Sequence, residues 1–282
     1  MTIKPIVGIL HPGSMGAAVA ACARPNAARV LWCPAGRSVA TVARAEQAGL
    51  EPVDNLDTLV KQAHVILSLC PPAAAEQLAH TVAERRYAGI YVEANAINPE
   101  RMTRIAEVLS RSARAVVDGA VIGSPPINGK KTQMYLSGSF DAIPLVEGLF
   151  AGSAVATPVL GEEVGRASAL KLAYSSYQKA SRVLAAVAFG AARAHGVDDA
   201  LLDVAGKRQG SYLVETGYIA KTAARAWRWG PEMDEAADML SAVGLPDEML
   251  RAVSQTLARW QDSKDLAELT PDEALDRLSR PQ

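Results

Sequence analysis

A glycine-containing turn near the start of the chain has the residue types that bind a diphosphate. A short apolar run at 6–10 leads into a turn with Gly13 and Gly16, and the Ala-rich, helix-favouring segment 17–23 follows at once. A strand, a glycine turn and a helix in this order place a diphosphate on the unpaired N–H groups at the helix N-terminus. Gly13 would let the backbone approach the diphosphate, and Gly16 would let the helix lie close to the strand. His11 stands where the dinucleotide fingerprint has its first glycine, so the match is incomplete.

The segment around the second apolar run indicates which dinucleotide would bind. In a dinucleotide fold, a carboxylate at the end of the second strand accepts the ribose 2′-OH and repels a 2′-phosphate. Segment 30–38 has no acidic residue, and the first one in the chain is Glu46. Arg37 and Ser38 instead offer a guanidinium and a hydroxyl that suit a phosphate, although Ser38 would also cap a helix beginning at Val39. We therefore expect NADP(H) to be preferred over NAD(H).

Alternating strand and helix patterns predict the scaffold that positions this turn. Short apolar runs alternate with amphipathic segments, which predicts an α/β fold of the Rossmann type, a mostly parallel sheet with helices on both faces. The expected strands are 6–10, 29–33, 65–70, 90–93 and 115–117, with further strands near 134–136 and 154–158. The expected helices are 16–23, 39–48, 56–61, 73–85 and 99–111. Glycines and prolines between residues 119 and 129 predict a loop at the strand ends.

The pattern changes near residue 160, after which only helical periodicity is found. Residues 162–195 are expected to form one helix about 50 Å long. A helix this long and apolar usually joins two domains or packs against a second subunit. We therefore predict a dinucleotide-binding domain over residues 1–160 and an all-α domain over residues 161–282. The second domain is expected to serve substrate binding and to form a homodimer.

The composition excludes several function classes. The 282 residues are 49% apolar and 21% charged with a net charge of −1, which is typical of a soluble globular protein and gives no basic surface for nucleic acid. No apolar run is long enough to span a bilayer, and the N-terminus lacks a signal pattern. The cysteines and histidines show no metal-ligand spacing. We expect a cytoplasmic protein with a small-molecule substrate, without metal, membrane or nucleic acid.

Four pieces of the first domain, in order, resemble the NAD(P)-binding 6-phosphogluconate dehydrogenase and β-hydroxyacid dehydrogenase superfamily. Residues 8–16 resemble its opening G-x-x-G-x-G-x-M-G, with His11 as the departure. Residues 63–72 resemble the strand and turn beside the cofactor, 93–99 the D-x-N-A-I-S-P stretch near the nicotinamide, and 118–124 the substrate loop D-A-P-V-S-G-G. The residues then expected to contact the cofactor are Gly8, Leu10, His11, Pro12, Gly13, Ser14, Met15, Gly16, Arg37, Ser38, Cys70, Pro71, Pro72 and Asn95.

A fifth piece carries the chemistry that the resemblance implies. Residues 165–175 align with the family's G-x-x-x-x-x-K-x-x-N-N, so Lys171 is implied to be the catalytic lysine, and Tyr174 and Ser175 replace both asparagines. On a helix these three residues share one face. A lysine in a cleft between domains is partly desolvated, which lowers its pKa and lets it exchange a proton with a substrate hydroxyl as hydride moves. Tyr174 and Ser175 could bind the same oxygen, orient the lysine, or only pack.

The resemblance also implies the substrate contacts. Gly123 and Ser124 lie where the family binds the substrate carboxylate, while Ile122 replaces a family serine, which leaves room for a substrate less polar than a simple β-hydroxyacid. Lys179 could meet an anionic substrate group, although a surface role is its ordinary alternative. The Asn95 amide could reach the nicotinamide carboxamide or the substrate.

Taken together, these features predict an NADP(H)-dependent oxidoreductase acting on a hydroxyl or carbonyl carbon, with Lys171 as general acid/base. Segments 174–179 and 226–233 resemble a little-characterised branch of the superfamily with its own C-terminal helical domain. Imine reductases share this architecture and usually carry an aspartate or tyrosine at the lysine position, so Tyr174 keeps reduction of a C=N bond as an alternative. A nucleotide-binding protein without turnover is a further alternative.

Overall fold

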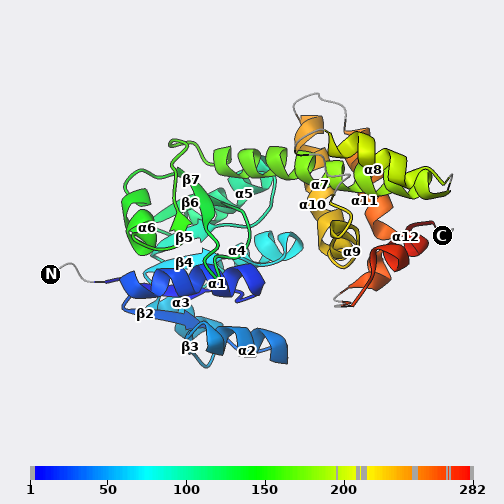
Figure 1. Ribbon diagram of the computed structural model, residues 1–282. Helices are drawn as coiled ribbons and strands as arrows, with labels where there is room; N and C mark the ends of the chain where they lie inside the picture. The colour runs from blue at the N-terminus through cyan, green and yellow to red at the C-terminus, as the bar shows by residue number, and fades with distance from the viewer. Residues whose placement is uncertain are drawn as a thin grey trace. The chain divides into compact units, whose positions relative to one another are not determined.

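The computed structural model describes residues 4–194, 196–207, 210, 215–242, 247–264, 266 and 268–279. The chain forms two compact units, Met1–Lys171 and Leu172–Gln282. The division falls inside a long helix, α7 (Arg166–Ala194), which corresponds to the predicted helix at 162–195 (Figure 1). The last residue of that prediction, His195, lies outside the described residues.

The first unit is built on an eight-stranded sheet with the order β3-β2-β1-β4-β5-β6-β7-β8 (Figure 1). All neighbouring strands are parallel except β6 and β7. The sheet therefore confirms the mostly parallel fold predicted from the alternating pattern. The strands are β1 (Ile6–Ile9), β2 (Arg29–Trp32), β3 (Glu51–Pro52), β4 (Val65–Ser68), β5 (Ile90–Glu93), β6 (Ala115–Ile122), β7 (Thr132–Gly138) and β8 (Val155–Ala156).

Helices cover both faces of this sheet because strand side chains alternate between the faces. Val7 and Ile9 of β1 belong to a buried apolar cluster with residues of α1, α2 and α6, whereas Ile66 and Tyr91 belong to a second cluster with residues of α3, α4 and α5. The helices are α1 (Ser14–Ala23), α2 (Val39–Gln47), α3 (Leu56–Gln62), α4 (Ala75–Glu84), α5 (Pro99–Leu109) and α6 (Ile143–Phe150). Two separate cores thus hold the sheet from either side.

Strand β6 differs from the prediction, because it continues to Ile122 where residues 119–129 were expected to be a loop. Its second half pairs antiparallel with β7, from Val117 opposite Gly138 to Ile122 opposite Gln133. Antiparallel pairing with β7, the next strand along the chain, therefore overrides the local turn signal of the glycine at position 119. Strand β3 was also not predicted, since its two residues have no apolar pattern.

The described residues of the second unit contain only helices, as predicted. Besides the rest of α7 they are α8 (Asp198–Gly206), α9 (Tyr218–Ala223), α10 (Ala226–Ala242), α11 (Glu248–Ala258) and α12 (Pro271–Ser279). Trp229, Met233, Leu250 and Leu257 are buried in its core, and the buried Trp260 donates its indole N–H to the Ala274 carbonyl at 2.7 Å. Within the described part of the chain, none of the helices combines the length and apolar character needed to cross a membrane.

Candidate nucleotide and catalytic site

The glycine turn after β1 leaves backbone donors open at the start of α1. The carbonyl oxygen of His11 accepts the Gly13 N–H at 2.9 Å, and a Cβ on Gly16 would collide with this same oxygen. Helix α1 has no side-chain cap and no acidic residue in its first turn. Its first N–H groups therefore remain for an external anion, which is the arrangement that a cofactor diphosphate requires.

His11, the unusual residue of this turn, contacts Arg37 from the loop after β2. Arg37 Nη2 donates to the Leu10 carbonyl at 2.9 Å, and Arg37 Nη1 lies 3.0 Å from His11 Nδ1. Burial, followed by the positive charges of Arg37 and Arg44, lowers the pKa of His11. His11 is therefore neutral at pH 7, and the turn and the loop are joined by a hydrogen bond that the imidazole accepts.

A basic cluster follows at the beginning of α2. Ser38 Oγ accepts the Thr41 N–H at 3.3 Å, which confirms the predicted helix cap, and Arg44 Nη2 donates to Thr41 Oγ1 at 3.2 Å. The Nε atoms of Arg37 and Arg44 are both buried and have no hydrogen-bond partner. Unpartnered guanidinium donors beside a helix start fit an anion such as a phosphate. Arg44 was not predicted, although its three-residue spacing from Thr41 was a readable signal.

A cavity of about 240 Å³ lies beside Arg37, on the side of the sheet covered by α3 and α4. Most of its wall is apolar, and such a wall suits the flat face of a nucleobase. Its lining residues are Leu10, Cys33, Ala35, Arg37, Asn55, Leu56, Leu59 and Leu78.

A row of buried polar side chains crosses four strands, at the carboxyl ends of β4 and β5, the middle of β6 and the last residues of the antiparallel β7. Ser68 of β4 is paired with Glu93 of β5, Glu93 with Asp118 of β6, and Asp118 with Ser137 of β7. Each of the four is at most 1% exposed. Residues in register on neighbouring strands point to one face of a sheet. The four side chains, here called the polar row, therefore form one continuous line.

Asn95 is attached to one end of the polar row. Its side-chain amide donates to Glu93 and, at 3.1 Å, to Ser68 Oγ, and its Oδ1 accepts the Cys70 N–H at 2.6 Å. Because the backbone N–H of Cys70 can only donate, the orientation of the amide is determined. The amide thus holds the turn after β4, and its direct contact with cofactor or substrate stays a prediction.

Glu93 is an acid of the polar row whose pKa is strongly shifted. Burial raises its pKa to about 7, against the opposing effect of the hydrogen bonds from Asn95 and Ser68, and the neighbouring Asp118 raises it further. Burial also raises the pKa of the nearby Cys70 thiol to about 12. The Cys70 thiol is therefore protonated at neutral pH, while Glu93 can hold or release a proton there.

Asp118, the third member of the polar row, holds the beginning of α7 together with Ser137. Its Oδ2 accepts the backbone N–H groups of Gly165 at 2.9 Å and Ser168 at 3.0 Å, and its Oδ1 accepts the Ser168 hydroxyl at 2.7 Å. Ser137 Oγ donates to Asp118 and accepts the Ala167 N–H at 3.2 Å. Burial raises the pKa of Asp118, and these bonds oppose the shift. Donors that a helix start leaves open are satisfied here by the sheet.

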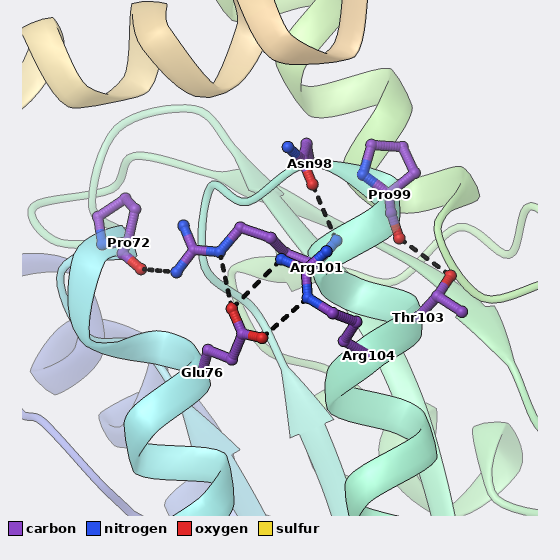
Figure 2. Close-up of polar contacts among 7 residues, drawn as sticks. All are labelled: Pro72, Glu76, Asn98, Pro99, Arg101, Thr103 and Arg104. Carbon is purple, nitrogen blue, oxygen red and sulfur yellow. Dashed lines mark hydrogen bonds and ion pairs between the residues drawn. The ribbon is translucent and has the colours of Figure 1, made fainter. Parts of the chain in front are cut away.

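Hydrogen bonds and ion pairs connect the turn after β4 to the start of α5, as Figure 2 shows. Glu76 of α4 binds Arg101 and Arg104 of α5, and Arg101 Nη2 donates to the Pro72 carbonyl at 3.0 Å. Asn98 Oδ1 accepts the Arg101 N–H at 2.8 Å and caps α5. The turn after β4 and the turn after β5 therefore keep a defined spacing.

The structure places Lys171 on the first turns of α7, one turn after Ser168 and on the same side of the helix. Its side chain is half-buried. Gly165, with a φ of +100° that favours glycine, lies against Pro99, so an added Cβ would be 3.2 Å from Pro99 Cβ. The start of α7 thus contacts both β6 and the first residue of α5.

The other predicted site residues on α7 belong to the second unit. Ser175 is buried, whereas Tyr174 is exposed and its hydroxyl accepts from Gln178 Nε2 at 3.2 Å. Lys179 is 8% exposed, forms an ion pair with Glu232 of α10 and lies 5.4 Å from the centroid of the Trp229 ring. The surface role weighed for Lys179 is therefore wrong, and the pairing with Glu232 already neutralises its charge.

The predicted substrate loop follows β6. The carbonyl of Ile122 accepts the Thr132 hydroxyl at 3.0 Å, Gly123 packs against the same Thr132, and Ser124 is exposed. Ile122, Gly123 and Ser124 therefore lie outside the hydrogen-bond network formed by Asn95, Ser68, Cys70 and Glu93. No group of three or more His, Cys, Asp or Glu side chains in the described ranges is arranged to hold a metal ion.

The polar row itself was not predicted as part of the site. Ser68, Glu93, Asp118 and Ser168 lie inside the motifs of the family resemblance without a predicted role of their own, and Ser137 lies outside them. The available signal was an acidic residue at the end of, or inside, an otherwise apolar strand, since a carboxylate there must be buried and hydrogen-bonded.

Comparisons with known proteins agree with this architecture. Residues 192–260 match the model of a domain of unknown function, DUF1932. An uncharacterized 28.5 kDa protein of Methanothermus fervidus is 28% identical over 187 residues, which are 66% of this chain and 70% of that protein.

Solved structures extend the similarity to the whole chain. A conserved protein of unknown function, reported as structurally similar to 3-hydroxyacid dehydrogenases, is 25% identical with a TM-score of 0.67, over 92% of this chain and 98% of that chain. The 3-hydroxyisobutyrate dehydrogenase of Mycobacterium tuberculosis, solved with L-serine, is 18% identical with a TM-score of 0.74, over 98% and 100%. A reductive aminase from Aspergillus terreus in complex with NADPH is 18% identical with a TM-score of 0.58, over 91% and 93%. In fold, this chain is therefore similar to a 3-hydroxyisobutyrate dehydrogenase and to a reductive aminase, which agrees with the family resemblance of its sequence motifs.

Proposed function

We propose that this protein is an NADP(H)-dependent oxidoreductase that acts on a hydroxyl or carbonyl carbon of a small substrate, with Lys171 as general acid/base. The observation that carries the proposal is the polar row, which connects the turn after β4 to the start of the helix bearing Lys171. Ligands of open α/β sheets bind outside the carboxyl ends of the strands. The open donors of α1, the basic cluster and the polar row all belong to that edge.

The residues divide the work as follows. A nicotinamide dinucleotide, when bound, supplies or accepts the hydride. In the reducing direction Lys171 Nζ donates a proton to the substrate oxygen, and in the oxidising direction it accepts the hydroxyl proton. Asp118 and Ser168 hold the turn of α7 from which Lys171 projects, and Asn95 holds the Cys70 turn.

The preference for NADP(H) is supported by charge at the adenosine end. The loop after β2 offers Arg37 and Ser38 and carries no carboxylate. The guanidinium groups of Arg37 and Arg44 bond to an imidazole, a carbonyl and a hydroxyl, so no carboxylate compensates their positive charge. Cofactor fluorescence titration compares the two cofactors directly, and tighter binding of NADH than of NADPH would contradict this part of the proposal.

Replacement of the proposed acid/base tests the reaction. Lys171→Met removes the ammonium group but keeps most of the chain length, so turnover should fall about 10²–10⁴-fold while NADPH binding is retained. Lys61→Met, on the exposed face of α3, is the matched control and should change neither. Wild-type protein is assayed with NADPH or NADP⁺ against hydroxyacids, ketoacids and cyclic imines. Unchanged turnover in Lys171→Met would remove the lysine from the mechanism, and NADPH binding without turnover of any substrate would favour a binding protein.

Reduction of a C=N bond is the second candidate. It is favoured by the exposed phenol of Tyr174, one turn after Lys171, and by the fold shared with a reductive aminase. Cyclic imines in the same panel distinguish the two reactions. Tyr174→Phe should reduce turnover of imines more than that of ketoacids if the phenol donates the proton.

A further inference from the structure

His11 occupies the position at which the dinucleotide fingerprint has its first glycine. Its backbone conformation does not require glycine. The non-glycine residues with positive φ in the described ranges are Arg86 and Asn128, so position 11 has an ordinary backbone conformation. Its ring lies beside Gly13, where an added Cβ would be 3.2 Å from His11 Cδ2 and Nε2. The glycine at position 13 therefore makes room for the imidazole.

The hydrogen bond between His11 and Arg37 has only one possible direction. A guanidinium has donors and no acceptor, so His11 Nδ1, 3.0 Å from Arg37 Nη1, must be the acceptor. The hydrogen of the neutral ring is then on Nε2. With Nη2 bonded to the Leu10 carbonyl at 2.9 Å, Arg37 is fixed at two points on the glycine turn.

This anchoring leaves the charge of the guanidinium uncompensated. The partners of Arg37 are an imidazole and a carbonyl, and that of Arg44 is the Thr41 hydroxyl, so neither guanidinium is bonded to a carboxylate. Both Nε atoms are buried without a partner. Arg37 also forms part of the wall of the 240 Å³ apolar cavity. An anion attached to a flat apolar group would satisfy all of these features.

We propose that His11 is a specificity-determining residue, which anchors Arg37 so that Arg37 and Arg44 bind the 2′-phosphate of an adenosine ribose. The inference rests on the proposed function, since it presupposes a dinucleotide on this edge of the sheet. His11, which occupies the position of the first glycine of the fingerprint, would thus contribute to the preference for NADP(H) over NAD(H). The glycine that the fingerprint has at this position would leave Arg37 with the Leu10 carbonyl alone.

The test uses nucleotide fragments and needs no turnover. Adenosine 2′,5′-bisphosphate and AMP are titrated into the full chain by calorimetry, so that only the 2′-phosphate differs between the ligands. His11→Phe keeps a ring beside Gly13 but has no acceptor, and it should bind the bisphosphate about 10-fold more weakly with AMP binding unchanged. His11→Asn keeps an acceptor near the Nδ1 position and should stay close to wild type. His80→Phe, on the exposed face of α4, controls for the loss of a histidine.

The outcomes separate this inference from the proposed function. The role of His11 would be overturned if the ratio of the bisphosphate affinity to the AMP affinity were the same in His11→Phe as in wild type. If both affinities fell by the same factor, the ratio would also be unchanged, and the substitution would have damaged the turn. Nucleotide binding by the wild type would leave the proposed function standing in either case. If the wild type binds neither ligand, nor NADPH, then the proposed function fails first and the inference with it.

Discussion

The two ends of the candidate site are built in opposite ways. The proposed adenosine end consists of the open backbone N–H groups at the start of α1 and of the half-buried side chains of Arg37 and Arg44. The Nε atoms of both arginines are buried without a hydrogen-bond partner. In the polar row all four side chains are buried and Asp118 accepts four hydrogen bonds from the protein, while Glu93 Oε2 is the buried oxygen of the row that has no partner in the described residues. Charged groups without a protein counter-charge are typical of ligand-binding sites, whereas buried polar groups that bond to each other stabilise a rigid scaffold. We therefore expect substitutions at the adenosine end to change binding and those in the polar row to change stability.

The largest effect is expected at Asp118. Asp118→Ala leaves the N–H groups of Gly165 and Ser168 without their acceptor in a buried position and should lower the free energy of unfolding of the first unit by about 3–5 kcal/mol. Asp118→Asn is the matched control, because its oxygen can accept both N–H groups while its amide donates to Ser168 Oγ. It should cost less than about 1.5 kcal/mol. Urea denaturation measures both, and equal losses would show that the charge of Asp118 matters more than its acceptors.

The next effect is a pH dependence that originates at Glu93. Its pKa is raised from 4.5 to about 7, so between these values the native state holds a proton that the unfolded chain has lost. The free energy of unfolding must then fall as the pH rises through this window, by at most roughly 3 kcal/mol. Glu93→Gln keeps an acceptor for Asn95 but cannot titrate, so its stability relative to wild type should increase over the window and then level off.

Urea denaturation across this pH range measures the difference between the Glu93→Gln variant and wild type. Glu84→Gln, at the exposed end of α4, serves as the control and should track wild type. A constant difference between Glu93→Gln and wild type at all pH values would mean that Glu93 has an ordinary pKa and that the polar row carries no proton.

The smallest effect on stability is expected at Arg44. Arg44→Gln removes a guanidinium whose hydrogen-bond partner is the Thr41 hydroxyl, so the free energy of unfolding should change by less than about 0.5 kcal/mol. The affinity for adenosine 2′,5′-bisphosphate should nevertheless fall roughly 5-fold, since a phosphate loses one charged donor. A stability loss comparable to that of Asp118→Ala would erase the contrast between the two ends of the site.

Local patterns in the sequence predicted most of the architecture and the local structure at the starts of α1 and α2. The apolar runs predicted the parallel strands, the glycine turn predicted the open start of α1, and Ser38 predicted the cap of α2. Each of these signals lies within a few neighbouring residues, where burial period, turn geometry and capping are decided. The predicted end of the strand at 117 was wrong because its continuation depends on pairing with β7.

By itself the sequence determined that this chain forms a Rossmann-type sheet, with a glycine turn after β1 and a loop that carries Arg37 and no carboxylate. Only the tertiary structure decided that Ser68, Glu93, Asp118 and Ser137 form one row and that His11 accepts a hydrogen bond from Arg37. The physical reason is that these partners lie far apart along the chain and meet through strand register and loop position. Register is fixed by cooperative pairing of whole strands, and no local pattern contains it.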